Sequence, residues 1–96
     1  MYGIHESVYS KLINYFEEKD YIEKVILFGS RAKGNYKYNS DIDLAILCHK
    51  LYKGTVVEEI EELIGVYSSD IVFLDQLTGD IKKQVDVYGI EIYSNN

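Results

Sequence analysis

A polar segment between two apolar runs carries two groups of residues whose types and spacing could do chemistry. At its start, Gly29 and Ser30 directly follow the apolar residues 25–28. A strand that ends here and restarts as a short helix leaves backbone N–H groups without partners, and these donors and the helix dipole favour an anion. Gly29 lets an anion approach without a Cβ in the way, and the Ser30 hydroxyl can donate to it. This end of the segment predicts a phosphate-binding turn.

At the other end of the segment, two aspartates enter the second apolar run. Asp41 and Asp43 are separated by Ile42, and side chains at alternate positions of a strand point to the same side. Two carboxylates on one face repel each other. A hard cation such as Mg²⁺, which prefers oxygen ligands and bridges to substrate phosphates, relieves that repulsion. A phosphate-binding turn joined to a metal-binding pair is the combination that phosphoryl or nucleotidyl transfer requires.

A third carboxylate is expected near this pair, because displacement at phosphorus needs the attacking hydroxyl to be deprotonated or held by a metal. Asp70 and Asp75 border the apolar residues 71–74. Their odd spacing places them on opposite faces of a regular strand, so at most one can join the pair. Asp70 begins its strand as Asp41 begins its own. We therefore predict Asp70 as the base or metal ligand, and Asp75 as a turn or cap residue.

Other polar side chains of the segment have two interpretations. Arg31 and Lys33 either contact phosphate or are solvated cations, since a helical turn points them in different directions. Tyr36 and Tyr38 could stack on a nucleobase, but loop tyrosines beside a sheet more often cover it. We include Arg31 and Lys33 among the predicted nucleotide-binding residues and assign no ligand to the tyrosines.

The motifs together carry a family resemblance. Gly29-Ser30 followed by Asp41-Ile42-Asp43 resembles the signature of the nucleotidyltransferase superfamily that includes DNA polymerase beta and the kanamycin nucleotidyltransferases. The variant GSRAKG at 29–34, followed by SDIDL at 40–44, is similar to the minimal nucleotidyltransferases, which are often encoded beside a HEPN-domain partner. The resemblance covers most of the chain, from the helix before residue 25 to about residue 93.

The resemblance implies a nucleotidyltransferase fold and a reaction that depends on Mg²⁺, with two metal ions expected. ATP would donate AMP to an acceptor hydroxyl and release pyrophosphate. An aspartate before an apolar strand also belongs to the family pattern, and SDIVFL at 69–74 matches it. The phosphates would be held by Gly29, Ser30 and Lys33, and the metals by Asp41, Asp43 and Asp70.

A more specific role also follows from the resemblance. It implies an antitoxin that adenylylates a tyrosine of a HEPN toxin, and hence a hetero-oligomer of the two proteins. The alternative is a non-catalytic antitoxin or binding module of the same fold, which neutralises its partner by occlusion.

Composition bounds these hypotheses. A chain of 96 residues, 47% hydrophobic and 27% charged, is expected to form a single domain, residues 1–96. Ten Lys and Arg spread along a chain of net charge −6 cannot assemble a basic face, so no extended nucleic-acid surface is expected. Cys48 has no cysteine partner, and no apolar run approaches the roughly 20 residues that span a bilayer. We expect a cytoplasmic protein without a membrane partner.

Apolar periodicity predicts the elements that position these residues. Helices are expected at 4–18, 55–63 and 80–88, with one or two helical turns at 30–34. Strands are expected at 24–28, 41–47 and 70–74, with an edge strand at 90–93. The order is α-β-α-β-α-β-α(-β), an α/β (α+β) fold. His5 and His49 lack metal-ligand spacing and are expected at the surface or at helix ends, and Cys48 is expected to be a small buried residue.

The site constrains the topology of the sheet. Ser30 follows the first strand and Asp41 precedes the second, so the two strands must run antiparallel for both residues to reach one nucleotide and its metal. Asp70, at the start of the third strand, requires strands two and three to be parallel. We therefore predict a small mixed sheet with flanking helices rather than an all-parallel sheet.

Overall fold

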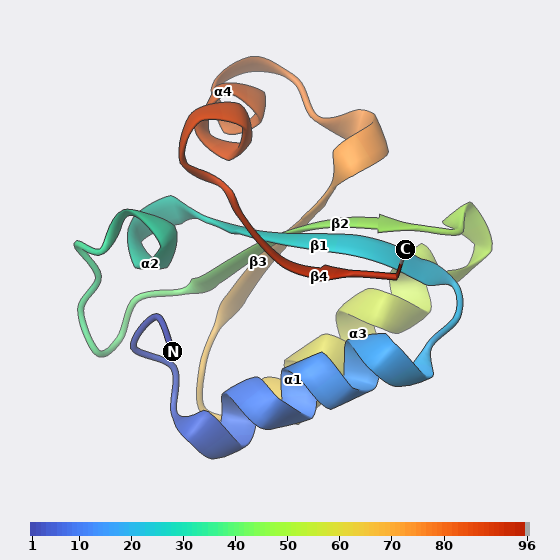
Figure 1. Cartoon of the computed structure of the whole chain (residues 1–96), viewed down its shortest axis with the longest axis horizontal. Coiled ribbons are helices and arrows are strands. Elements are labelled where there is room, and N and C mark those ends of the chain that lie inside the picture. Colours follow the sequence, from blue (N-terminus) through green and yellow to red (C-terminus); the bar gives the residue numbers. More distant parts are fainter. Residues whose placement is uncertain (96) are drawn as a thin grey trace.

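A computed structural model of the chain describes residues 1–95 and shows a mixed β-sheet with helices on both faces (Figure 1). The element order is the predicted one, and most boundaries differ from the prediction by one or two residues. In chain order the elements are α1 (Glu6–Glu18), β1 (Ile22–Phe28), α2 (Gly29–Lys33), β2 (Ile42–Cys48), α3 (Lys53–Ile64), β3 (Ser69–Phe73), α4 (Gly79–Tyr88) and β4 (Ile90–Ser94), with short 3₁₀ helices at Lys50–Tyr52 and Leu74–Gln76.

The sheet has the strand order β3-β2-β1-β4. Strand β1 runs antiparallel to both β2 and β4, whereas β2 and β3 are parallel. The mixed sheet predicted from the positions of Ser30, Asp41 and Asp70 is therefore confirmed. This topology brings the end of β1 and the starts of β2 and β3 to the same edge of the sheet.

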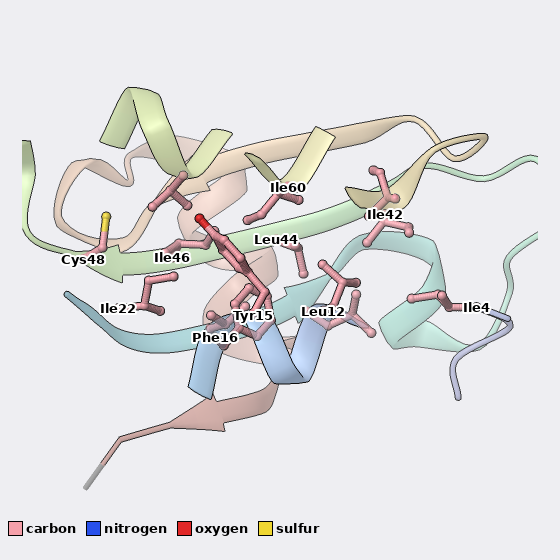
Figure 2. Close-up of a cluster of buried hydrophobic side chains, with 14 residues drawn as sticks. Ile4, Leu12, Tyr15, Phe16, Ile22, Ile42, Leu44, Ile46, Cys48 and Ile60 are labelled. Atoms are coloured by element: carbon pink, nitrogen blue, oxygen red, sulfur yellow. The ribbon is translucent and has the colours of Figure 1, made fainter. Parts of the chain in front are cut away.

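The two faces of β2 have different surroundings, and this difference fixes its register. Ile42, Leu44 and Ile46 are fully buried in the larger core, which fills the space between the sheet and helices α1 and α3 (Figure 2). Ala45 points to the opposite face and packs with Phe28 and Val85, below helix α4. A slip by one residue would exchange the two faces and expose the buried isoleucines and leucine. Asp43 is thereby held on the α4 face.

Three residues without a predicted catalytic role take the expected places. The ring nitrogens Nδ1 of His5 and His49 accept hydrogen bonds from the backbone N–H groups of Ser7 and Leu51, so both histidines cap helix starts. Cys48 is buried at 6% exposure.

The helices within residues 1–95 are all too short or too polar to cross a membrane.

Candidate active site

The turn between β1 and α2 is built around Gly29, which begins helix α2 with φ at +74°. This backbone conformation is readily adopted by glycine and is strained for residues with a Cβ. Phe28, which precedes the helix, gives no side-chain cap to its first N–H groups in the described part of the chain. Ser30 follows and is half-buried. The turn therefore retains the free backbone donors and the hydroxyl that were expected of a phosphate-binding turn.

Gly29 also lies directly against Asp43. Phe28 is the register partner of Asp43 across the antiparallel pair β1 and β2. A Cβ added to Gly29 would lie 2.0 Å from Oδ2 of Asp43 and 2.8 Å from its Cγ, closer than real atoms approach. The glycine is required because the carboxylate occupies the space that a side chain would need. The two ends of the polar segment thus meet in space.

Asp70 lies beside Asp43 on the neighbouring strand. The two residues are register partners across the parallel strands β2 and β3, and side chains of partner residues stand on the same face of a sheet. Asp41 and Asp70 are exposed, whereas Asp43 is half-buried. The structure therefore places Asp70 beside Asp43, and Asp41 is near enough for its charge to act on Asp43. Their chemical roles stay predictions.

The electrostatics of Asp43 reflect this crowding. Burial is the largest cause that raises its pKa, from 3.8 to about 6, and the negative charges of Asp70 and Asp41 raise it further. The positive charge of Arg31 acts in the opposite direction. Ionised Asp43 is thus a carboxylate whose charge the protein alone does not neutralise. A cation bound at its oxygens would supply the missing charge.

The donor set fits a hard divalent cation, although the carboxylates are not arranged as a finished site. Within residues 1–95, no three acidic, His or Cys side chains are gathered closely enough to form a ready-made metal site. Asp41 is turned toward Ser68, whose hydroxyl donates to its Oδ1. Oxygen ligands from two adjacent strands suit Mg²⁺, and Asp41, Asp43 and Asp70 would hold it.

The two cations of α2 lie in different environments. Arg31 is buried at 1% exposure and donates to two backbone carbonyls, those of Tyr2 and Ser40. The guanidinium is turned into the protein, and the predicted phosphate contact of Arg31 stays a prediction. Lys33 is exposed, and its Nζ lies 4.9 Å from the ring centre of Tyr88 on α4. Its predicted phosphate contact stays a prediction.

The two loop tyrosines and Asp75 have different surroundings. Tyr36 lies against Arg31, 5.4 Å from the guanidinium carbon to the ring centre, whereas Tyr38 is 91% exposed. Asp75 lies in the 3₁₀ turn after β3 and forms an ion pair with Lys53, with Nζ and Oδ1 2.9 Å apart. Asp75 is thus a turn residue, as predicted.

The sequence analysis missed Ser68, which precedes β3. Its hydroxyl binds the Asp41 carboxylate, and its carbonyl accepts a hydrogen bond from the N–H of Ile42 at 2.9 Å. The signal was available in principle: if β2 and β3 are parallel and Asp43 pairs with Asp70, the residue two positions before Asp70 must lie beside Asp41. The pairing register was needed to see it.

Comparison with known proteins assigns the chain to a protein family. The family model described as "Polymerase beta, Nucleotidyltransferase" matches residues 10–96. The chain belongs to this family. A Methanocaldococcus jannaschii protein, named provisionally as a protein adenylyltransferase, is 31% identical over 81 residues, which cover 77% of this chain and 82% of the relative.

Solved structures share the nucleotidyltransferase fold. A chain of the crystal structure of a toxin-antitoxin with AMP-PNP has a TM-score of 0.70 and 22% identity, covering 90% of this chain and 73% of the other. A chain of the tri-AMPylated Shewanella oneidensis HEPN toxin in complex with MNT antitoxin has a TM-score of 0.66 and 18% identity, covering 94% and 72%. At these identities the likeness establishes the fold, which agrees with the fold predicted from the sequence.

The contact between Gly29 and Asp43 predicts a specific effect of one methyl group. Gly29→Ala should lower the transferase rate by about 100-fold, because the new Cβ displaces the Asp43 carboxylate. Gly34→Ala is the matched control: Gly34 also has a positive φ, +85°, but a Cβ there meets nothing within 4 Å. Both variants should lose about 1–2 kcal/mol of stability in urea denaturation. Equal activity of the two variants would contradict the role assigned to Gly29.

The raised pKa of Asp43 predicts that this residue destabilises the metal-free fold. The pKa of Asp43 in the folded protein, about 6, exceeds the ordinary value of 3.8. The ionised side chain therefore lowers the free energy of unfolding, by an amount that grows from about pH 4 to about pH 6 and is constant at higher pH. In EDTA at pH 8, Asp43→Asn should therefore be more stable than the wild type by about 1 kcal/mol, allowing for solvent screening.

Urea denaturation at a series of pH values measures this difference. The advantage of Asp43→Asn should shrink as the pH falls from 6 to 4, and the exposed control Asp20→Asn should stay within about 0.5 kcal/mol of the wild type throughout. A loss of stability in Asp43→Asn at pH 8 would show that the carboxylate is not under strain.

Proposed function

We propose that this nucleotidyltransferase transfers AMP from ATP to a tyrosine hydroxyl of a partner protein, with Mg²⁺, and acts as the antitoxin of a HEPN toxin. The observation that carries the proposal is the register of three strands, in which Phe28 pairs with Asp43 and Asp43 pairs with Asp70. This register places the glycine turn and the acidic side chains together. The relative named as a protein adenylyltransferase and the toxin-antitoxin structures of the same fold support the choice of acceptor.

The proposed mechanism assigns one task to each part of the site. The backbone donors at Gly29 and the Ser30 hydroxyl hold the β and γ phosphates, with Lys33 as a further cation. These contacts would orient the α phosphate toward the acceptor and stabilise the pyrophosphate leaving group. Bound Mg²⁺ would neutralise phosphate charge and favour the ionised acceptor hydroxyl.

The aspartates complete the mechanism. Asp41 and Asp43 would hold Mg²⁺, and Asp70 would either hold a second Mg²⁺ or accept the proton of the acceptor hydroxyl. Asp70 is exposed at the start of β3, where an incoming tyrosine from another protein can reach it. Residues 1–96 are proposed to act as one nucleotidyltransferase domain in the cytoplasm, where ATP is available, in a hetero-oligomer with the toxin.

Labelled ATP tests the proposal directly. The chain is incubated with Mg²⁺, a HEPN-domain protein as the proposed acceptor, and ATP labelled at either the α or the γ phosphate. We expect only the α label to appear on the HEPN protein, at a tyrosine. Asp41→Asn/Asp43→Asn should reduce the label by at least about 100-fold, and the exposed control Asp20→Asn, at the far end of β1, should not.

Two results would contradict the proposal. Transfer of the γ label would make the protein a kinase. Neutralisation of the toxin that persists in Asp41→Asn/Asp43→Asn, without any transferred label, would favour the alternative in which the chain acts by occlusion.

A further inference from the structure

We propose that Arg31 is a positioning residue, which fixes the loop that carries Asp41 so that this carboxylate can meet the metal. The inference deepens the proposed function and rests on it for the meaning of the metal site. It differs from the prediction made from the sequence, in which Arg31 contacts phosphate. Three sets of contacts carry it.

The first set is the hydrogen bonding of the guanidinium. Arg31 is 1% exposed, which is unusual for a charged side chain that forms no direct ion pair within residues 1–95, although its charge acts on Asp43. Its Nη1 donates to the carbonyl of Tyr2 at 3.1 Å, and its Nη2 donates to the carbonyl of Ser40 at 2.8 Å. Its Nε has no hydrogen-bond partner among the described residues. The side chain therefore ties helix α2 to the N-terminal turn and to the loop before β2.

The second set is a pair of tyrosine rings against the same group. The guanidinium carbon lies 5.4 Å from the ring centre of Tyr36 and 5.3 Å from that of Tyr67. Tyr36 belongs to the loop after α2, and Tyr67 belongs to the loop before β3. The hydroxyl of Tyr67 accepts a hydrogen bond from the backbone N–H of His5 at 2.9 Å. Three segments that are far apart in the sequence thus meet around one side chain.

The third set connects this cluster to Asp41. Ser40, whose carbonyl binds Arg31, immediately precedes Asp41. Ser68, which immediately follows Tyr67, donates its hydroxyl to the Asp41 carboxylate. The carbonyl of Ser68 also accepts the N–H of Ile42, on the other side of Asp41. Arg31 thus contacts Ser40, which precedes Asp41 in the chain, and Tyr67, which precedes the residue that binds the Asp41 carboxylate.

The chemistry of arginine suits this task. Its guanidinium is planar, presents donors in a fixed fork, and stacks on aromatic rings, whereas a lysine ammonium is a compact charge on a flexible stem. Lysine could keep the charge but could not reach both carbonyls in this geometry while packing between two rings. At 1% exposure, Arg31 would have to move out of this buried cluster to meet a phosphate in solvent.

The test separates metal binding from nucleotide binding. Arg31→Lys and Arg31→Gln are compared with the wild type and with Lys37→Gln, an exposed cation of the same loop. Binding of Mn²⁺ without nucleotide is measured by electron paramagnetic resonance, and binding of AMP-PNP in EDTA by NMR titration. We expect the Arg31 variants to bind Mn²⁺ about tenfold more weakly, with the affinity for AMP-PNP in EDTA within about twofold of the wild type. Lys37→Gln should match the wild type in both.

Kinetics give a second readout. A misplaced Asp41 carboxylate should slow the reaction without weakening the binding of the ATP phosphates. We therefore expect kcat to fall at least about tenfold while KM for ATP stays within about twofold of the wild type. A tenfold loss of AMP-PNP affinity in EDTA with unchanged Mn²⁺ binding would overturn the proposal and make Arg31 a phosphate ligand. Wild-type values for Arg31→Lys in every measurement would also overturn it.

A second pair of variants covers the case in which changes at Arg31 prevent folding. Tyr36→Phe keeps the ring against Arg31 and should behave as the wild type, whereas Tyr36→Leu removes it and should weaken Mn²⁺ binding. Equal Mn²⁺ binding by the two variants would count against the proposal. A wild-type protein that binds Mn²⁺ but transfers no AMP would refute the proposed function and leave the Mn²⁺ comparison as an independent test of Arg31.

Discussion

Mutual repulsion of three carboxylates is the physical constraint around which this site is arranged. Asp43 and Asp70 are register partners on adjacent parallel strands, and Asp41 stands at the start of the same strand as Asp43. Burial of Asp43 and the charges of its two neighbours raise its pKa to about 6. A bound cation would relieve this repulsion.

The core of the protein keeps this arrangement in place. The alternation of buried Ile42, Leu44 and Ile46 with outward Asp43 and Ala45 leaves β2 one register, because any slip exposes the large side chains that pack under α1 and α3 (Figure 2). Gly29 then lets the turn between β1 and α2 lie against Asp43, since a side chain at this position would collide with the carboxylate. Hydrophobic packing on one face of the sheet thus determines the position of the Asp43 carboxylate on the other face.

The sequence predicted the parts of this account that depend on local pattern. Apolar periodicity located the helices and strands, and the requirement that Ser30, Asp41 and Asp70 serve one ligand was sufficient to predict which strands run parallel. The alternation of side chains along a strand allowed only one of Asp70 and Asp75 to join the pair, and the place of Asp70 at the start of its strand decided the choice. Each of these inferences uses spacing within an element or between the ends of neighbouring elements.

The contacts of Arg31 and Ser68 could not be predicted from spacing in the sequence. A five-residue helix gives no periodicity from which to decide whether Arg31 faces solvent or the protein interior. The partners that bury it, Tyr2, Tyr36 and Tyr67, come from three segments, and only the folded chain brings them together. Ser68 acquires its contact with Asp41 through the register of β2 and β3, which the sequence does not state.

The pKa of Asp43 is the measurement that tests the central claim most directly. A titration of the side-chain carboxyl carbon by NMR, in EDTA and then with Mg²⁺ and AMP-PNP, reports the charge environment of this one group. The account predicts a pKa of about 6 in EDTA and a fall below the ordinary 3.8 with metal and nucleotide. A pKa that stays the same in both conditions would mean that no cation binds at Asp43, and the proposed metal site would be wrong.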